Sequence, residues 1–121
     1  MKKILIVEDV EMNRDLLVQL LEDDYELVEA TDGQEGLEMA AQEKPDLILL
    51  DISLPEMDGY EVAGRIRETD DLKEIPIIAV TAHAMAGDQE KAIEAGCTDY
   101  LSKPIDEEEL WAQVAKYTAD A

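Results

Sequence analysis

Short apolar segments alternate with helical patterns five times along the chain, and this alternation restricts the fold more than any other feature. Three of the segments are almost continuously aliphatic, including residues 4–7 and 47–50. Strands that are covered by helices on both faces have such sequences, which predicts a parallel sheet between two helical layers. The expected strands are residues 3–7, 26–30, 46–50, 76–80 and 99–101.

The segment after the first expected strand has a clear helical period. Met12, Leu16 and Leu20 recur every four residues, with Leu17 and Leu21 beside them. This spacing predicts one apolar stripe on the first helix.

Further helices are expected between the remaining strands. Apolar residues at helical spacing predict helices around 36–41, 60–66 and 86–95, and Gly96 is suited to end the last of these. Another helix should begin at Asp106, because Glu109 follows three residues later as an acidic form of the capping box. Five β-then-α units predict a doubly wound α/β domain, (βα)5, that covers residues 1–121.

Reactive side chains follow the expected strands at the points where those strands end. Glu8 and Asp9 follow the first strand, Asp51 the third, Thr81 the fourth and Lys103 the fifth. In open α/β sheets, ligands bind beyond the carboxyl ends of the strands, where the strand order reverses. The sequence therefore predicts one site that combines three carboxylates, a hydroxyl and an ammonium group.

The predicted site suits phosphoryl chemistry. Clustered carboxylates repel one another, and a hard cation such as Mg²⁺ relieves the repulsion. An activated carboxylate such as Asp51 can attack phosphorus, while Lys103 and Thr81 can contact phosphoryl oxygens. Any single acidic residue at a strand end is often only a helix cap or a turn residue. The coincidence of matching groups at four strand ends favours the functional interpretation.

The composition excludes several classes of function. Ten Lys and Arg residues face 31 Asp and Glu residues, which gives a formal net charge of −21. This charge repels nucleic acid and anionic membranes, so neither is an expected partner. Cys97 is the only cysteine and His83 the only histidine, which argues against a disulfide, a zinc site and Cys–His catalysis. No apolar run is long enough for a membrane span or a signal peptide, and a cytoplasmic location is expected.

Five segments together resemble the receiver domains of bacterial two-component response regulators. They are ILIVED (4–9), PDLILLD (45–51), LPEMDG (54–59), PIIAVTA (76–82) and GCTDYLSKP (96–104). The resemblance spans essentially the whole chain. Within the family, the sequence is similar to stand-alone regulators and to the receivers of hybrid kinases. It implies a flavodoxin-like sheet with strand order 2-1-3-4-5 and no output domain.

The resemblance also implies a role for each residue of the predicted site. Asp51 matches the phosphoacceptor, and Lys103 the lysine that contacts the phosphoryl group. Mg²⁺, for which Mn²⁺ can substitute, is expected on Glu8, Asp9, Asp51 and the backbone carbonyl of Ser53. Thr81 and Tyr100 match the switch pair, and a cis bond is expected before Pro104.

A signalling role through protein contacts follows from the same resemblance. The expected phosphodonor is a histidine kinase or a histidine phosphotransfer protein. The expected target reads the face formed by the fourth helix, fifth strand and fifth helix. Catalysis should be limited to the protein's own phosphorylation and slow dephosphorylation. Ser53 and His83 occupy two positions that tune phosphoryl lifetime in the family, and neither is an amide or an acid, which predicts a long-lived phosphoryl form.

Two alternative functions and two residues with open roles remain. An aspartyl-phosphate phosphohydrolase needs a second acid two residues after the nucleophile, but Ser53 occupies that position. A flavodoxin-like cofactor binder needs a Ser-, Thr- and Gly-rich phosphate loop, but acidic residues follow the first strand. Cys97 is expected to be a buried structural thiol without a basic neighbour. Trp111 fits either a partner-facing position or partial burial against the sheet edge.

Overall fold

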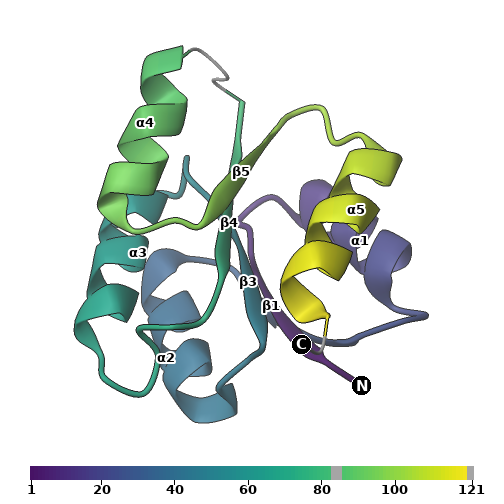
Figure 1. Ribbon diagram of the computed structural model, residues 1–121, viewed down its shortest axis with the longest axis horizontal. Coiled ribbons are helices and arrows are strands. Elements are labelled where there is room, and N and C mark those ends of the chain that lie inside the picture. The colour runs from purple at the N-terminus through teal and green to yellow at the C-terminus, as the bar shows by residue number, and fades with distance from the viewer. Residues whose placement is uncertain (83–85, 120–121) are drawn as a thin grey trace.

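The computed structural model describes residues 1–82 and 86–119, with backbone alone for residues 86–88. The described residues form one parallel sheet in the order β2-β1-β3-β4-β5, which confirms the predicted topology. Helices alternate with the strands along the chain (Figure 1). The elements are β1 (Lys3–Val7), α1 (Glu11–Leu21), β2 (Glu26–Ala30), α2 (Gly33–Glu43), β3 (Leu47–Asp51), α3 (Gly59–Glu68), β4 (Ile77–Thr81), α4 (Ala86–Ala95), β5 (Asp99–Ser102) and α5 (Glu107–Thr118).

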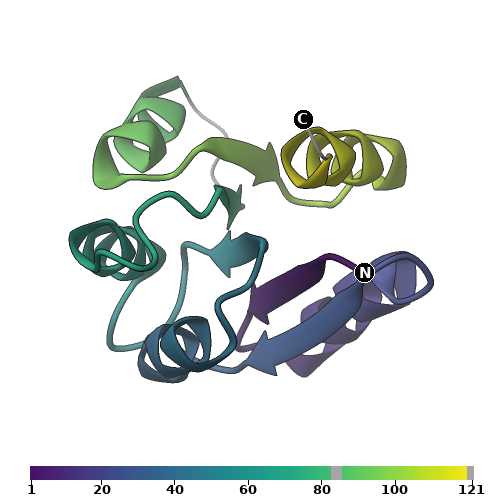
Figure 2. The ribbon, with the colours of Figure 1, turned by 60° about the horizontal axis from the view of Figure 1, so that its bottom comes forward.

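Two hydrophobic clusters hold the helices against opposite faces of the sheet. Figures 1 and 2 show α2, α3 and α4 on one face and α1 and α5 on the other. Strand residues alternate between the faces, so Ile48 and Leu50 pack under α2–α4, while Leu47 and Leu49 pack under α1 and α5. Every residue of β3 and β4 is buried, as expected for strands that are covered on both sides.

Aspartates begin three of the helices and fix where these helices start. Asp32, Asp58 and Asp106 each accept a hydrogen bond from the backbone amide three residues later, at 2.7, 3.0 and 3.1 Å. Such caps satisfy amide groups that have no partner within the helix. The predicted start of α5 at Asp106 is therefore confirmed. Gly96 ends α4 with a φ of 120°, which also agrees with its predicted role.

Only part of the apolar stripe predicted on the first helix faces the sheet. Leu17 and Leu21 are buried, whereas Met12 is 80% exposed and Leu16 is 42% exposed. The apolar residues cover more of the helix circumference than the sheet can bury, so periodicity alone did not identify the inward side. Three strands also end one residue later than predicted, so that Asp51 and Thr81 are the last residues of β3 and β4.

Arg67 connects α3 to the two loops that lead into β4 and β5. Its guanidinium donates hydrogen bonds to the carbonyls of Gly96, Lys73 and Ile75, at 2.7–2.8 Å. Cys97 is buried as predicted, but the expected lack of a basic neighbour was wrong because Arg67 lies close to it. Burial raises the pKa of the Cys97 thiol to about 11, although the Arg67 charge acts in the opposite direction. The thiol therefore stays protonated at neutral pH, as a structural cysteine should.

Gly59 allows the first turn of α3 to pack directly on the end of β3. A Cβ atom at this position would lie 2.6 Å from the Asp51 carbonyl oxygen and 2.7 Å from the Ile52 Cα. Backbone atoms cannot move aside as a flexible side chain can. Gly64 lies in the same helix, where a Cβ would meet nothing closer than the Ala95 carbonyl oxygen at 3.9 Å.

We expect opposite effects from alanine at these two glycines. Gly59→Ala should lower the free energy of unfolding by about 1–3 kcal/mol, because the strand that holds Asp51 must shift. Gly64→Ala should raise it by about 0.5–1 kcal/mol, since alanine favours the helical backbone. Urea denaturation of both variants measures the two changes. Equal stability of the two variants would contradict the close packing at Gly59.

Candidate functional site

Three carboxylates meet where the strand order reverses between β1 and β3. Glu8 follows β1 directly, Asp51 ends β3, and the two strands pair side by side with Val7 opposite Leu50. Glu8, Asp9 and Asp51 each place a carboxylate oxygen within 4.8 Å of the others. Glu8 and Asp51 are only 2% and 4% exposed, whereas Asp9 is exposed. The structure therefore brings together the acidic residues that the sequence predicted.

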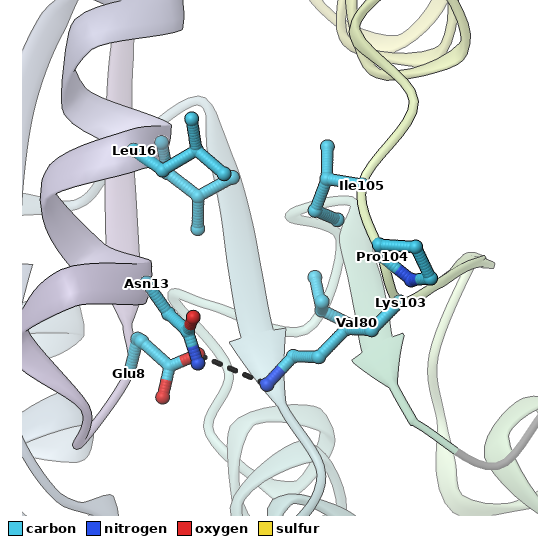
Figure 3. A pocket seen from close by; sticks show the side chains of 8 residues that line it. Glu8, Asn13, Leu16, Val80, Lys103, Pro104 and Ile105 are labelled. Carbon is cyan, nitrogen blue, oxygen red and sulfur yellow. Dashed lines mark hydrogen bonds and ion pairs between the residues drawn. The ribbon is translucent and has the colours of Figure 1, made fainter.

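Lys103, which directly follows β5, adds a positive charge to this group of carboxylates. Its Nζ atom lies 3.1 Å from Glu8 Oε1 (Figure 3). The same atom lies 3.6 Å from Asp51 Oδ2. The Lys103 amide also donates to the Thr81 carbonyl at 2.8 Å, which continues the pairing of β4 with β5. The bond between Lys103 and Pro104 is cis, as predicted. A lysine that is distant in sequence thus offsets part of the negative charge of two buried carboxylates.

Backbone amides hold the two buried carboxylates in place. The Ser53 amide donates to Asp51 Oδ1 at 3.0 Å, and the Val10 amide donates to Glu8 Oε2 at 3.1 Å. Each carboxylate therefore has one oxygen fixed by the chain and the other facing Lys103. Fixed carboxylate oxygens around a shared space are the ligands that a hard divalent cation prefers.

Thr81 and Tyr100 lie on the same face of the sheet. Tyr100 pairs with Ala79 across β4 and β5, and Thr81 is two residues beyond Ala79. Thr81 is buried, and the half-buried Tyr100 packs against the hydrophobic cluster under α2–α4. Thr81 therefore ends the strand that pairs with β3, next to the strand end that holds Asp51, and Tyr100 lies on the same face of the sheet as Thr81. The prediction for His83 lies outside the described residues.

Two hydrogen bonds fasten β5 to α5 around Tyr100. Gln113 Nε2 donates to the Tyr100 carbonyl at 3.1 Å, and the Tyr117 hydroxyl donates to Asp99 Oδ2 at 2.8 Å. Burial, together with the hydrogen bond to Asp99, raises the pKa of Tyr117, so the phenol remains a donor at neutral pH. These two hydrogen bonds hold the backbone around Tyr100, and neither of them involves the Tyr100 ring.

A cavity of about 400 Å³ opens beside the carboxylates, between α1 and the segment that joins β5 to α5 (Figure 3). Its walls are mostly apolar, with the Glu8–Lys103 pair at one side. Sequence reasoning missed the part that Asn13 and Ile105 play here, because nothing in their local sequence indicates that they meet. The lining residues are Glu8, Asn13, Leu16, Leu17, Val80, Lys103, Pro104 and Ile105.

The fold and the acidic site agree with a family match. Residues 4–115 match the response regulator receiver domain. The chain therefore belongs to the response regulator receiver domain family, which fits a signalling switch that phosphorylation controls. None of the described helices is both long and apolar enough to cross a membrane.

Individual relatives are similar over nearly their full length. The polar-differentiation response regulator DivK of Brucella anthropi is 44% identical over 121 residues, which cover 99% of this chain and 98% of the relative. A crystal structure of a putative response regulator from Chloroflexus aurantiacus superposes with a TM-score of 0.93 at 32% identity, covering 98% of both chains. The receiver domain of a sensor histidine kinase from Pseudomonas aeruginosa gives 0.91 at 34% identity and 98% coverage of both chains. That structure has a magnesium ion coordinated in its active-site cleft.

Magnesium should stabilise the protein through the three carboxylates. At about ten times its Kd, Mg²⁺ should raise the free energy of unfolding by about 1.4 kcal/mol. Asp51→Asn and Asp9→Asn should each reduce this gain, because each removes one negative ligand. Urea denaturation at several Mg²⁺ and Mn²⁺ concentrations measures the effect.

The exposed Asp70 provides the matched control for these two substitutions. Asp70→Asn makes the same change in charge outside the site and should leave the gain from Mg²⁺ unaltered. A full gain in the Asp51→Asn variant would place the cation elsewhere.

Proposed function

We propose that the protein is a signalling switch that accepts a phosphoryl group on Asp51 from a phosphohistidine donor. The observation that supports this most directly is the position of the Asp51 carboxylate. It is buried, it lies within 4.8 Å of two other carboxylates, and its Oδ2 atom is 3.6 Å from Lys103 Nζ. Family membership supports the same role.

The proposed reaction is a transfer between two nucleophiles. A carboxylate oxygen of Asp51 attacks phosphorus, the bond from phosphorus to the donor imidazole nitrogen breaks, and that nitrogen keeps the electron pair. The product is an acyl phosphate on Asp51. Lys103 is positioned to pair with a phosphoryl oxygen, and the Ser53 amide holds Asp51 in place during the attack. The protein thus acts on itself, and its turnover is limited to slow dephosphorylation.

The residues present fit a magnesium ion. Glu8, Asp9, Asp51 and the Ser53 carbonyl would hold it, and Mn²⁺ would suit the same oxygen ligands. When bound, the ion would neutralise charge on the phosphoryl oxygens. Ser53 also argues against the alternative of a phosphohydrolase, because it leaves no second acid two residues after Asp51. The long phosphoryl lifetime and the cytoplasmic location remain predictions.

Switching would use Thr81 and Tyr100. A phosphoryl group on Asp51 adds negative charge and acceptor oxygens near the end of β4, where Thr81 can donate to one of them. Movement of Thr81 would leave space for the Tyr100 ring on the same face of the sheet. The altered surface of α4, β5 and α5 would then bind a target protein, with the phosphoryl group selecting among conformers. Residues 1–121 would act as one receiver domain, with output through that contact.

The donor would approach along α1. Met12 is 80% exposed and Leu16 is 42% exposed, and we call these two residues the α1 rim. Leu16 also lines the apolar cavity that adjoins Glu8 and Lys103. A phosphohistidine must come within bonding distance of Asp51, so the protein that presents it must cover this rim. An exposed apolar rim beside a buried reactive group suits such a transient contact.

Asp51→Asn should abolish phosphorylation by acetyl phosphate in the presence of Mg²⁺. The wild type should gain one phosphoryl group in intact-mass spectrometry, because the Asp51 carboxylate is the nucleophile. Asp58→Asn is the matched control, since Asn caps a helix as well as Asp does, and this variant should be modified like the wild type. Equal modification of the Asp51→Asn protein would show that another residue accepts the group.

Leu16→Glu should slow phosphotransfer from a histidine phosphotransfer protein by about tenfold, as loss of a central apolar contact does. Its rate with acetyl phosphate should stay within about twofold of the wild type, because the chemistry itself is untouched. Ile93→Glu on α4 is the matched control, since Ile93 is 47% exposed and lies outside the α1 rim. Radiolabelled phosphotransfer measures both rates. Equal slowing by the two variants would rule out the α1 rim as the donor's docking surface.

A further inference from the structure

Trp111, whose role the sequence left open, lies on α5 with its ring turned toward the end of α1. Its Nε1 donates a hydrogen bond to the Leu20 carbonyl at 2.8 Å, yet the residue remains 43% exposed. The last carbonyls of a helix have no partner within the helix, so this bond both completes the end of α1 and fixes the indole orientation. An indole that is held in place and still exposed is available for recognition.

The exposed indole lines a hollow of about 460 Å³ between α1 and α5, which we call the Trp111 hollow. Asp23, Asp24 and Tyr25, from the turn between α1 and β2, form its other side. Among the described residues, none that lines the hollow belongs to the acidic site or lines the cavity beside it. A ligand here would therefore leave the Asp51 site open.

The chemistry of the Trp111 hollow favours a cation. Asp23 and Asp24 are exposed, neither forms an ion pair with another described residue, and no Lys or Arg lines the hollow. The face of an indole attracts cations, and Trp is the best aromatic residue for this contact. A guanidinium group can stack on the ring with its flat face and donate hydrogen bonds from its edge to carboxylates.

The overall charge narrows the class of occupant. With 31 acidic and 10 basic residues, a second copy of the chain would be repelled, as would nucleic acid or an anionic membrane. A basic protein segment is attracted by the negative charge of the whole chain, and its positive charges match the two aspartates of the hollow. We propose that the Trp111 hollow binds an arginine side chain presented by a segment of a partner protein. This contact is separate from the phosphorylation switch and does not depend on it.

The single tryptophan of the chain provides the readout, because its fluorescence reports on this hollow alone. The probe is an acetylated and amidated peptide, Gly-Arg-Gly-Arg-Gly, titrated into the unphosphorylated full chain at about 0.15 M salt. A matched peptide with citrulline in place of arginine keeps the shape and removes the charge. We expect a saturable fluorescence change with the arginine peptide and none with the citrulline peptide.

Paired substitutions separate the Trp111 hollow from general attraction to an acidic protein. Asp23→Asn with Asp24→Asn should weaken binding of the arginine peptide about fivefold, as the loss of exposed ion pairs does. Asp70→Asn with Asp71→Asn is the control: this exposed acidic pair lines a hollow that no described aromatic residue lines. Lys73 also lines that hollow, and Lys44 lies 3.7 Å from Asp71. The control makes the same change in charge and should weaken binding less than twofold. Trp111→Ala, measured by calorimetry, should weaken binding about two- to fivefold.

The result overturns the proposal if the fluorescence does not saturate, if the citrulline peptide binds equally well, or if the two aspartate pairs weaken binding equally. The aspartate variants decide the matter even if Trp111→Ala unfolds, because all four aspartates are exposed. Phosphorylation of Asp51 by acetyl phosphate should be unaltered in the Asp23→Asn/Asp24→Asn variant. Failure of that reaction in the wild type would instead count against the proposed function.

Discussion

The repulsion between buried carboxylates at the ends of β1 and β3 is the constraint on which the site depends. Glu8 and Asp51 are almost fully buried in a chain whose net charge is already −21. Burying like charges together costs free energy unless a cation lies beside them. Lys103 provides one, and the remaining negative charge favours a divalent ion.

The scaffold can hold such an unfavourable arrangement because its sheet is covered on both faces. The two hydrophobic clusters fix β1, β3 and β4, so the residues at their carboxyl ends cannot separate to relieve the repulsion. Gly59 lets α3 start directly against β3 and keeps that strand end in place. Rigid strands that present groups from short loops are the usual basis for a preorganised site.

The two ends of β5 connect the site to the surface. Lys103, just beyond the strand, contacts the carboxylates, while Gln113 and Tyr117 of α5 hold the backbone around Tyr100. Tyr100 itself is half-buried and packs against the hydrophobic cluster under α2–α4. In the proposed switch, a side chain would change position while the sheet would not. The Trp111 hollow lies outside this route, on the other side of α5.

The sequence by itself determined the strand order through its family resemblance, and it determined the polar groups at the strand ends. The strands and the polar groups are local features: aliphatic runs define strands, and the residue after a run lies at the end of its strand whatever its neighbours are. The rotation of α1, the contacts of Arg67, the cavity beside Asn13 and the bond from Trp111 to Leu20 needed the tertiary structure. Each depends on how helices settle against a sheet, where packing among distant residues decides between arrangements that have the same local pattern.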